Sequence, residues 1–401
     1  MNSSASAVAW CERLGSAAAS APASGIAEVM RHGFGRNGII PLWVGEGDEP
    51  TPAFICETAA ESMARGETFY MPQPGIQQLR DGLAAYHDRL YGGLFGEPFP
   101  ADRFYVTGSG MQAIQIAIRL VADPGDEVIV PTPAWPNFPA AVGVAGAKAC
   151  QVPLRFDPAG WRLDLDDIAA AIGPRTKALF INSPSNPTGW TATEADLAAI
   201  VELCRRRDLW IIADEVYSRF TYGSDRPTTP SLHDHIVPDD RVLFVNTFSK
   251  NWAMTGWRVG WIEAPEAIGP AIENLIQYAT SGVAVFMQRA AARALSEGES
   301  ALSSLIDRAR IGRDIVSTAL AAIPGVSFAP PGGFYLFFRV DGVSNSTEFA
   351  ATLIKEADVG LAPGSAFGAG GEGFFRLCFA RNPDDLSEAC ARFANWMSRR
   401  A

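Results

Sequence analysis

Histidine and cysteine, the residues that most often build metal sites and disulfide frameworks, are scarce in this sequence. The chain has 401 residues but only four histidines and six cysteines. The cysteines show no C-x-x-C spacing, so we expect neither a zinc site nor a disulfide framework, and a reduced, cytoplasmic protein instead. The run His233-Asp234-His235 has no partner cluster. We therefore expect a solvated loop there and no bound metal.

Excess positive charge and long apolar runs are lacking as well. A net charge of −11 argues against nucleic acid or an anionic membrane as a partner. No apolar run approaches the roughly 20 residues that a membrane-spanning helix needs. The N-terminus is rich in alanine and serine, but no basic region precedes an apolar core, and Glu12 interrupts it. A flexible arm is therefore expected there, and a secretory signal is not.

The rest of the composition is typical of a globular enzyme with a sizeable core. Apolar residues make up 48% of the chain and charged residues 19%, and the length suffices for two domains. From residue 104 onward, apolar strands alternate with amphipathic helices, which predicts an α/β fold whose mostly parallel sheet is covered on both faces. The expected strands are 104–108, 127–131, 177–182, 209–214, 242–248 and 261–265.

The stretch 242–261 carries the most informative residue, Lys250, just after one of these strands. We expect Phe248, Trp252 and Trp257 to crowd its amine. Poor solvation lowers the pKa of a lysine and favours the neutral, nucleophilic form. The hydroxyls and the cation nearby suit an anionic group such as a phosphate; they are Thr247, Ser249 and Arg258. The alternative is an ordinary exposed lysine.

Ligands of open α/β sheets collect at the carboxyl ends of the strands, where several polar or aromatic residues fall. Ser109 and Gly110 open a helix, whose N-terminus can hold a phosphate, and Trp135 offers a ring for stacking. Asp214 ends a strand and could keep a ring nitrogen protonated, while Asn186 and Tyr217 could hold a phenolate oxygen. Together with Lys250 these groups fit pyridoxal phosphate.

An ordered series of motifs here resembles the fold-type I, class I/II aminotransferases, the aspartate aminotransferase superfamily. The matching segments span nearly the whole chain; they are Gly45-Glu46-x-Asp48, Tyr70, Gly75-x-x-x-Leu79-Arg80, Asn186-Pro187-Thr188-Gly189, Asp214-Glu215-x-Tyr217, Ser249-Lys250-x-x-x-Met254-Thr255-Gly256-Trp257-Arg258-x-Gly260, Pro363-Gly364-x-x-Phe367-Gly368 and Arg376-Leu377.

The resemblance implies a large domain with a seven-stranded, mostly parallel sheet between helices, and a smaller α+β domain formed by the N-terminal segment and the C-terminal part. The expected division is 1–48 for the N-terminal arm and part of the small domain, 49–295 for the large cofactor-binding domain, and 296–401 for the C-terminal small domain. The implied activity is ping-pong transfer of an amino group from an L-amino acid to a 2-oxo acid, with pyridoxal 5'-phosphate as cofactor.

The resemblance also implies a role for each matching residue. Lys250 forms the aldimine with the cofactor and then moves the proton, Asp214 holds the ring nitrogen, and Tyr217 and Asn186 hold the ring oxygen. Trp135 stacks on the ring and, with Asn186, borders the substrate. The implied phosphate ligands are Gly110, Met111, Gln112, Thr247, Ser249 and Arg258, with Tyr70 reaching the phosphate of a second subunit in a homodimer. Arg376 would clamp the substrate α-carboxylate bidentately, which a lysine cannot do, aided by Gly45.

One departure from the family pattern concerns the substrate side chain. No counterpart of the second arginine used by dicarboxylate-specific members is found, which speaks against strict aspartate specificity. Three acids in one loop, Glu46, Asp48 and Glu49, suggest the hypothesis that arginine-like donors are accepted. The alternative is that these acids cap the following helix or face solvent.

Two other activities remain as alternatives. A β-lyase, which performs α,β-elimination with the same cofactor and lysine, fits the same scaffold. An NAD-dependent dehydrogenase is the more remote one, because Gly108-x-Gly110-x-x-Ala113 also matches a dinucleotide fingerprint. The acidic residue of that fingerprint should end the next strand, which ends instead in Pro131-Thr132-Pro133.

Overall fold

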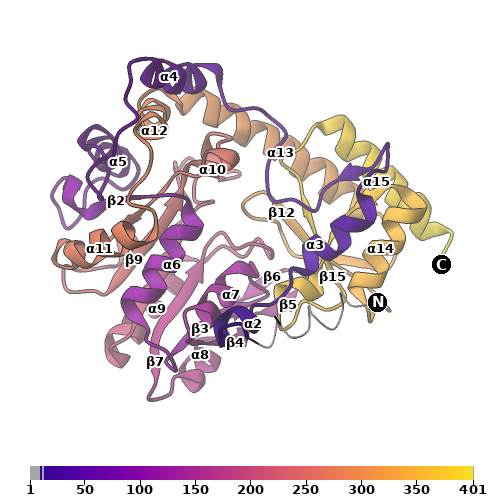
Figure 1. The fold of residues 1–401 in the computed structure, drawn as a ribbon. Coiled ribbons are helices and arrows are strands. Elements are labelled where there is room, and N and C mark those ends of the chain that lie inside the picture. Colours follow the sequence, from indigo (N-terminus) through magenta and orange to yellow (C-terminus); the bar gives the residue numbers. More distant parts are fainter. Residues whose placement is uncertain (1–9, 11–12, 401) are drawn as a thin grey trace.

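A computed structural model describes Trp10 and residues 13–400, and its larger part is built on one sheet (Figure 1). The seven strands lie in the order β2-β10-β9-β8-β7-β3-β4. All neighbours pair in parallel except β10, which is antiparallel to both β2 and β9. The expected mostly parallel sheet is thereby confirmed. The strands are β2 (Phe104–Thr107), β3 (Glu127–Thr132), β4 (Lys148–Pro153), β7 (Thr176–Asn182), β8 (Trp210–Asp214), β9 (Val242–Thr247) and β10 (Gly260–Glu263).

Strand β10 runs against its neighbours because the connection before it is short. A parallel return needs a crossover of a dozen or more residues, usually with a helix. Between β9 and β10 the chain forms only α10 (Phe248–Asn251) and a single 3-10 turn, Thr255–Trp257. It therefore turns back alongside β9, and this turn carries Lys250.

Helices cover both faces of the sheet, since successive strand residues point to opposite sides. Ile212 of β8 packs with α6 (Gly110–Val121), α7 (Asn137–Val144) and α11 (Gly269–Ala279). Its neighbour Ile211 packs on the other face, with α8 (Leu165–Ala171) and α9 (Glu194–Arg207). A further apolar cluster joins the β2 edge to α4 (Ala53–Ala64), α5 (Gln77–Tyr91) and α12 (Val285–Glu297).

A second, antiparallel sheet lies beside the helices α13 (Glu299–Ala321), α14 (Ser346–Ala357) and α15 (Pro383–Ser398) (Figure 1). Its order is β11-β12-β15-β14. The N-terminal segment joins this part, because β1 (Ile40–Pro41) pairs in parallel with β13 (Val359–Gly360), as expected for the small domain. The boundaries near 48 and 295 stay a prediction. The remaining strands are β5 (Arg155–Asp157), β6 (Gly160–Arg162), β11 (Val326–Phe328), β12 (Tyr335–Val340), β14 (Ala362–Pro363) and β15 (Phe374–Cys378).

Two local expectations are corrected. The N-terminal arm is expected to be flexible. Its residues 1–9, 11 and 12 lie outside the described residues, but its described part forms α2 (Ser16–Ala19) and α3 (Gly25–Met30), and α3 lies against β14 and α14. The loop at His233 was expected to be solvated, yet the His233 side chain is buried and stacks on Phe244 with ring centres 3.8 Å apart. Both corrections have the same cause: these short segments pack against distant elements.

The described residues offer no helix long and apolar enough to cross a membrane. Five of the six cysteines fall within the described part of the chain and are free: Cys56, Cys150, Cys204, Cys378 and Cys390. Cys11 and Glu12 lie outside the described residues.

Candidate active site

A cavity of about 340 Å³ opens where the carboxyl ends of the central strands meet the small sheet. It is lined by residues that follow five different strands, as the sequence predicted. These are Gly110 and Met111 after β2, Trp135 after β3, Asn186 after β7, Asp214 at the end of β8 and Tyr217 after it, and Thr247 at the end of β9 with Ser249, Lys250 and Arg258 after it. Gly45 and Arg376 line it from the N-terminal segment and β15.

Lys250 points its amine into this cavity and is held by the N-terminal segment. Its Nζ donates to the carbonyl oxygen of Gly45 at 2.8 Å and lies 5.9 Å from the centre of the Phe334 ring. Burial lowers the pKa of Lys250 to about 8. Of the rings expected to crowd it, Phe248 and Trp252 pack instead against each other in the core. A substantial fraction of the amine is therefore in its neutral, nucleophilic form near physiological pH. The aromatic ring beside it is that of Phe334, which the sequence did not indicate.

Asp214 is a buried carboxyl at the end of β8 without a cation partner among the described residues. Its Oδ1 accepts a hydrogen bond of 3.3 Å from the Val216 backbone N–H. Burial raises the pKa of Asp214 to about 7. A buried carboxyl of this kind would be stabilised as a carboxylate by a cationic N–H placed in the cavity.

Arg376 is a buried guanidinium that likewise forms no ion pair with any described residue. One nitrogen donates to Oδ1 of Asn186 at 2.8 Å and another to the carbonyl oxygen of Trp43, while Nε has no partner. Its charge lies over the rings of Tyr335 and Phe367, at 4.7 and 5.0 Å. Since buried charges are normally paired, this arginine fits an anionic ligand.

Asn186 and Tyr217 lie next to this arginine with hydrogen-bonding capacity left for a ligand. Asn186 uses its side-chain oxygen on Arg376, so its NH₂ group is the part left to donate. The Tyr217 hydroxyl bonds to the hydroxyl of Tyr335 at 2.9 Å. Each can therefore donate to one oxygen placed in the cavity.

At the opposite end of the cavity the groups suit a phosphate. Helix α6 begins at Gly110, so its positive end faces this region. The hydroxyls of Thr247 and Ser249 lie 2.9 Å apart. Arg258 lines the same end, donates to the carbonyl oxygen of Thr255 at 2.6 Å and forms no ion pair with a described residue.

Two of the expected cofactor ligands are not brought to this cavity. Gln112 turns its side chain away: Nε2 donates to Thr280 at 3.0 Å and Oε1 accepts from the Gly108 N–H, while its backbone N–H is taken by Ser109. It therefore does not line the cavity. Tyr70 lies on the surface, 90% exposed, and does not line the cavity.

Sequence reasoning missed several residues that line the cavity. Tyr335 lies in the apolar strand β12, where the pattern indicated only core, although a hydroxyl in such a strand is a signal that a polar partner is near. Helix α3 contributes Ile26, Ala27 and Met30. No local signal marks these three, because their place depends on how the N-terminal segment packs.

The family model for aminotransferase class I and II matches residues 37–393. The chain thus belongs to the class I and II aminotransferases. It is 35% identical to the arginine–pyruvate transaminase of Pseudomonas aeruginosa, with 89% of each chain covered. It is also 35% identical to an aromatic-amino-acid aminotransferase of Thermococcus litoralis, covering 89% of this chain and 91% of that one. The solved aspartate aminotransferase of Thermotoga maritima superposes with a TM-score of 0.88 at 32% identity, over 96% and 100% of the two chains.

Family members use pyridoxal 5'-phosphate, and the residues present fit that group. The uncompensated Asp214 suits its ring nitrogen, the free donors of Asn186 and Tyr217 suit its ring oxygen, and the end with Arg258 suits its phosphate. The protein is therefore an aminotransferase that uses this cofactor. The dinucleotide reading of Gly108 and Gly110 is thereby set aside.

Proposed function

We propose that this aminotransferase takes its amino group from L-amino acids with apolar side chains and passes it to a 2-oxo acid. The observation that carries this proposal is the lining of the cavity. Its charged members among the described residues are Asp214, Lys250, Arg258 and Arg376. Each of them matches the cofactor or the substrate α-carboxylate, so none is left for a charged substrate side chain.

The wall beside these groups is apolar. Ile26, Ala27 and Met30 of α3 line the cavity together with Met111 and Ile114 of α6. Removing apolar surface from water contributes roughly 25 cal/mol per Å², whereas a charged side chain placed there would lose its hydration without a partner. The lining therefore favours donors such as leucine or phenylalanine.

The acidic loop with Glu46, Asp48 and Glu49 supports arginine-like donors less than the cavity lining supports apolar ones. Asp48 pairs with Arg308 at 2.7 Å and accepts a hydrogen bond from the Asn382 backbone N–H, and Glu49 also pairs with Arg308. Glu46 lines a separate, smaller cavity of about 40 Å³ behind Lys250. The acids do not cap the helix that follows either, because α4 begins after Pro52 and has no acidic residue in its first turn.

The chemistry proposed for the bound state follows from these positions. Pyridoxal phosphate, when bound, supplies an aldehyde that condenses with amines and a ring that accepts electrons from the substrate Cα. Arg376 orients the substrate through its carboxylate, and Asp214 holds a proton on the ring nitrogen. With the cofactor bound, the neutral amine of Lys250 would act as the base that moves the proton from the substrate Cα to the former aldehyde carbon of the cofactor.

A homodimer and a cytoplasmic location complete the proposal. Phe69, Tyr70 and Tyr278 are each more than 80% exposed, and large exposed apolar side chains suit an interface. Tyr70 would then reach the phosphate bound by the other subunit. Analytical ultracentrifugation should show a dimer, and a monomer that stays fully active would contradict this part. The free cysteines support a reducing compartment.

The test is a half-reaction screen. The holoenzyme is mixed with leucine, phenylalanine, alanine, aspartate or arginine, and the visible absorbance of the bound cofactor is followed. Leucine and phenylalanine should convert it fastest; dominance of aspartate or arginine would overturn the proposed preference. Release of ammonia and an oxo acid without an acceptor would indicate the β-lyase alternative instead. Lys250→Ala should show no turnover.

A substitution in α3 tests the apolar wall directly. Met30→Ala removes part of it and should lower kcat/KM for phenylalanine about tenfold, since one or two methylenes in an apolar pocket are worth roughly 1–3 kcal/mol. Alanine, whose side chain is too short to reach the wall, should be affected little. Met63→Ala is the matched control, because Met63 is exposed on α4. An equal loss for both substrates would show that α3 does not contact the substrate side chain.

A further inference from the structure

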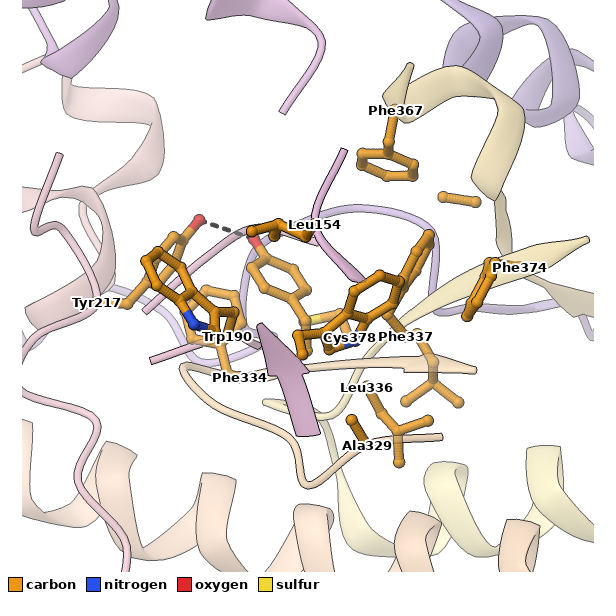
Figure 2. Packing of buried hydrophobic residues seen from close by; sticks show 14 of the residues in the cluster. Leu154, Trp190, Tyr217, Ala329, Phe334, Leu336, Phe337, Phe367, Phe374 and Cys378 are labelled. Carbon is orange, nitrogen blue, oxygen red and sulfur yellow. Dashed lines mark hydrogen bonds between the residues drawn. The ribbon is translucent and has the colours of Figure 1, made fainter. Parts of the chain in front are cut away.

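Tyr335 occupies a central position in the site that neither the motifs nor the roles above account for. It begins strand β12 and is only 1% exposed. Its hydroxyl lies 2.9 Å from the hydroxyl of Tyr217, the contact drawn as a dashed line from Tyr217 in Figure 2. Its ring lies under the guanidinium of Arg376, 4.7 Å away. Tyr335 thus contacts both Tyr217, which is proposed to bind the ring oxygen of the cofactor, and Arg376, which is proposed to bind the substrate carboxylate.

The N-terminal loop closes around the same hydroxyl. A Cβ added to Gly45 would lie 2.2 Å from the Tyr335 oxygen, so the residue at 45 must be glycine for this tyrosine to fit. The carbonyl oxygen of Gly45 in turn accepts the hydrogen bond from Lys250. The position of Tyr335 is therefore determined from three sides, by Tyr217, Arg376 and the Gly45 loop.

The direction of the bond between the two phenols follows from counting protons. Each phenol has one proton to donate. If Tyr217 donates its proton to the cofactor's ring oxygen, its own oxygen is free to accept, and Tyr335 is the donor within reach. A donor that itself accepts a hydrogen bond is polarised and donates more strongly. The two tyrosines then form a chain that ends on the ring oxygen.

We propose that Tyr335 is a positioning residue that donates to Tyr217 and strengthens the Tyr217 hydrogen bond to the ring oxygen of pyridoxal phosphate. This inference rests on the proposed roles of Tyr217 and Lys250. A stronger hydrogen bond draws electron density from that oxygen. The oxygen then accepts a weaker hydrogen bond from the protonated nitrogen that links Lys250 to the cofactor, so this nitrogen loses its proton more readily. Tyr335 therefore lowers the pH at which the holoenzyme's chromophore loses this proton.

The experiment is a spectrophotometric pH titration of the holoenzyme, which needs no turnover. Tyr335→Phe should raise the midpoint of the visible absorbance change by about 0.5 to 1 pH unit, the size expected when one neutral hydrogen bond is lost. Tyr335→Leu should shift the midpoint in the same direction. Tyr222→Phe is the matched control, because the Tyr222 hydroxyl is also mostly buried and donates to Gly333, two residues before Tyr335, at 2.6 Å. It should leave the midpoint unchanged.

A double substitution tests whether Tyr335 changes the titration midpoint through Tyr217 or by another interaction. In the Tyr217→Phe background, Tyr335→Phe should produce no further shift, because the chain is already broken. An equal shift in both backgrounds would overturn the proposal, as would an unchanged midpoint in both Tyr335 variants. A wild-type holoenzyme without any pH-dependent visible absorbance would instead contradict the proposed roles of Lys250 and its cofactor.

Discussion

Poor solvation should make the amine of Lys250 more reactive than that of an exposed lysine, and this should be measurable in its titration. Burial lowers the pKa of Lys250 to about 8, against about 10.4 for a lysine in an unfolded chain. The neutral amine therefore predominates above about pH 8 in the folded protein. Neutral amine is the form that reacts with aldehydes.

Labelling of the cofactor-free protein should reveal this pKa. After brief exposure to formaldehyde and borohydride, the modified fraction at Lys250, read by peptide mass spectrometry, should rise with pH around a midpoint near 8. The same residue in protein unfolded with urea serves as the control and should show a midpoint above 10. Equal midpoints in the two states would contradict a desolvated amine.

Arg376 differs from other arginines of the chain in being buried without an ion-pair partner among the described residues. Arg376→Lys keeps the charge but loses the planar pair of donors. Hydrogen bonds to charged groups are worth about 1.5–3 kcal/mol, so kcat/KM should fall about 10- to 100-fold for every amino acid donor. Arg310→Lys, on exposed α13 surface, should leave steady-state kinetics unchanged. Loss restricted to one donor would show that Arg376 binds a side chain instead.

Helix α3 is too short to be stable alone, since isolated helices below about 12 residues are marginal in water. It has six residues, and the side chain of its N-cap, Ser24, accepts a hydrogen bond from the Ala27 N–H at 3.2 Å. Gly25, the first residue of α3, packs closely against Ala366, since a Cβ added to Gly25 would lie 3.1 Å from the Cβ of Ala366. The apolar wall proposed to contact the substrate thus depends on this cap and on the packing of α3 against β14, α14 and the turn Gly364–Phe367.

Loss of this cap should act on substrate binding. Ser24→Ala removes an N-cap worth about 0.5–2 kcal/mol and should raise KM for an apolar donor severalfold while changing kcat less. Thr193→Ala breaks the capping box of α9 and is the matched control: it should lower the urea midpoint without changing KM. If Ser24→Ala leaves KM at the wild-type value, packing alone holds α3.

Across the fold, the least expected feature is a buried charged cluster between α5, the His233 turn and β10. Glu263 is fully buried and accepts hydrogen bonds from Arg103, at 3.2 Å, and His233, at 2.7 Å; His87 lies 3.3 Å away. Burial opposes its charge, but His233 and His87 outweigh it and hold the pKa of this carboxyl well below its usual range. We propose no metal there, because Arg103 already neutralises the carboxylate.

Breaking this cluster should destabilise the protein. Glu263→Gln leaves Arg103 buried without its counter-charge, which typically costs about 3–5 kcal/mol, and urea unfolding should show this loss. Glu202→Gln, which breaks an exposed pair on α9, should have a much smaller effect. A similar small effect for both variants would mean that water reaches Arg103.

The pH dependence of stability should follow from the same residues. Burial lowers the pKa of His87 below 6.5, so the unfolded chain takes up a proton near pH 6.5 that the folded protein does not. In an Asp214→Asn background, which removes the opposite contribution of a carboxyl whose pKa is raised to about 7 in the fold, stability should therefore fall as the pH drops below about 6.5. Glu263, with its lowered pKa, adds a further loss at more acidic pH. Urea midpoints that are constant from pH 7.5 to 5.5 would contradict a neutral, buried His87.

Local patterns in the chain were enough to predict most of the polar residues that line the cavity. Apolar runs of strand length ended at Asp214, Asn182 and Thr247, and in a parallel sheet all such ends meet at one edge. Residues that act just after a strand are therefore predictable from the order of strands alone. The lysine, the carboxyl and the phosphate end were found in this way, and the ends of the six expected strands agreed with the structure to within two residues.

Features that depend on which distant segments pack together were decided only in three dimensions. Tyr335 meets Tyr217 across 118 positions of sequence, α3 reaches the cavity from the N-terminal segment, and Arg308 takes up the charge of Asp48 and Glu49. The periodicity of apolar residues predicts whether a residue faces the core, but it does not predict which distant residue it will contact there. The kind of chemistry could therefore be predicted from the sequence, whereas the apolar wall proposed to select the substrate and the contact between Tyr217 and Tyr335 depended on tertiary packing.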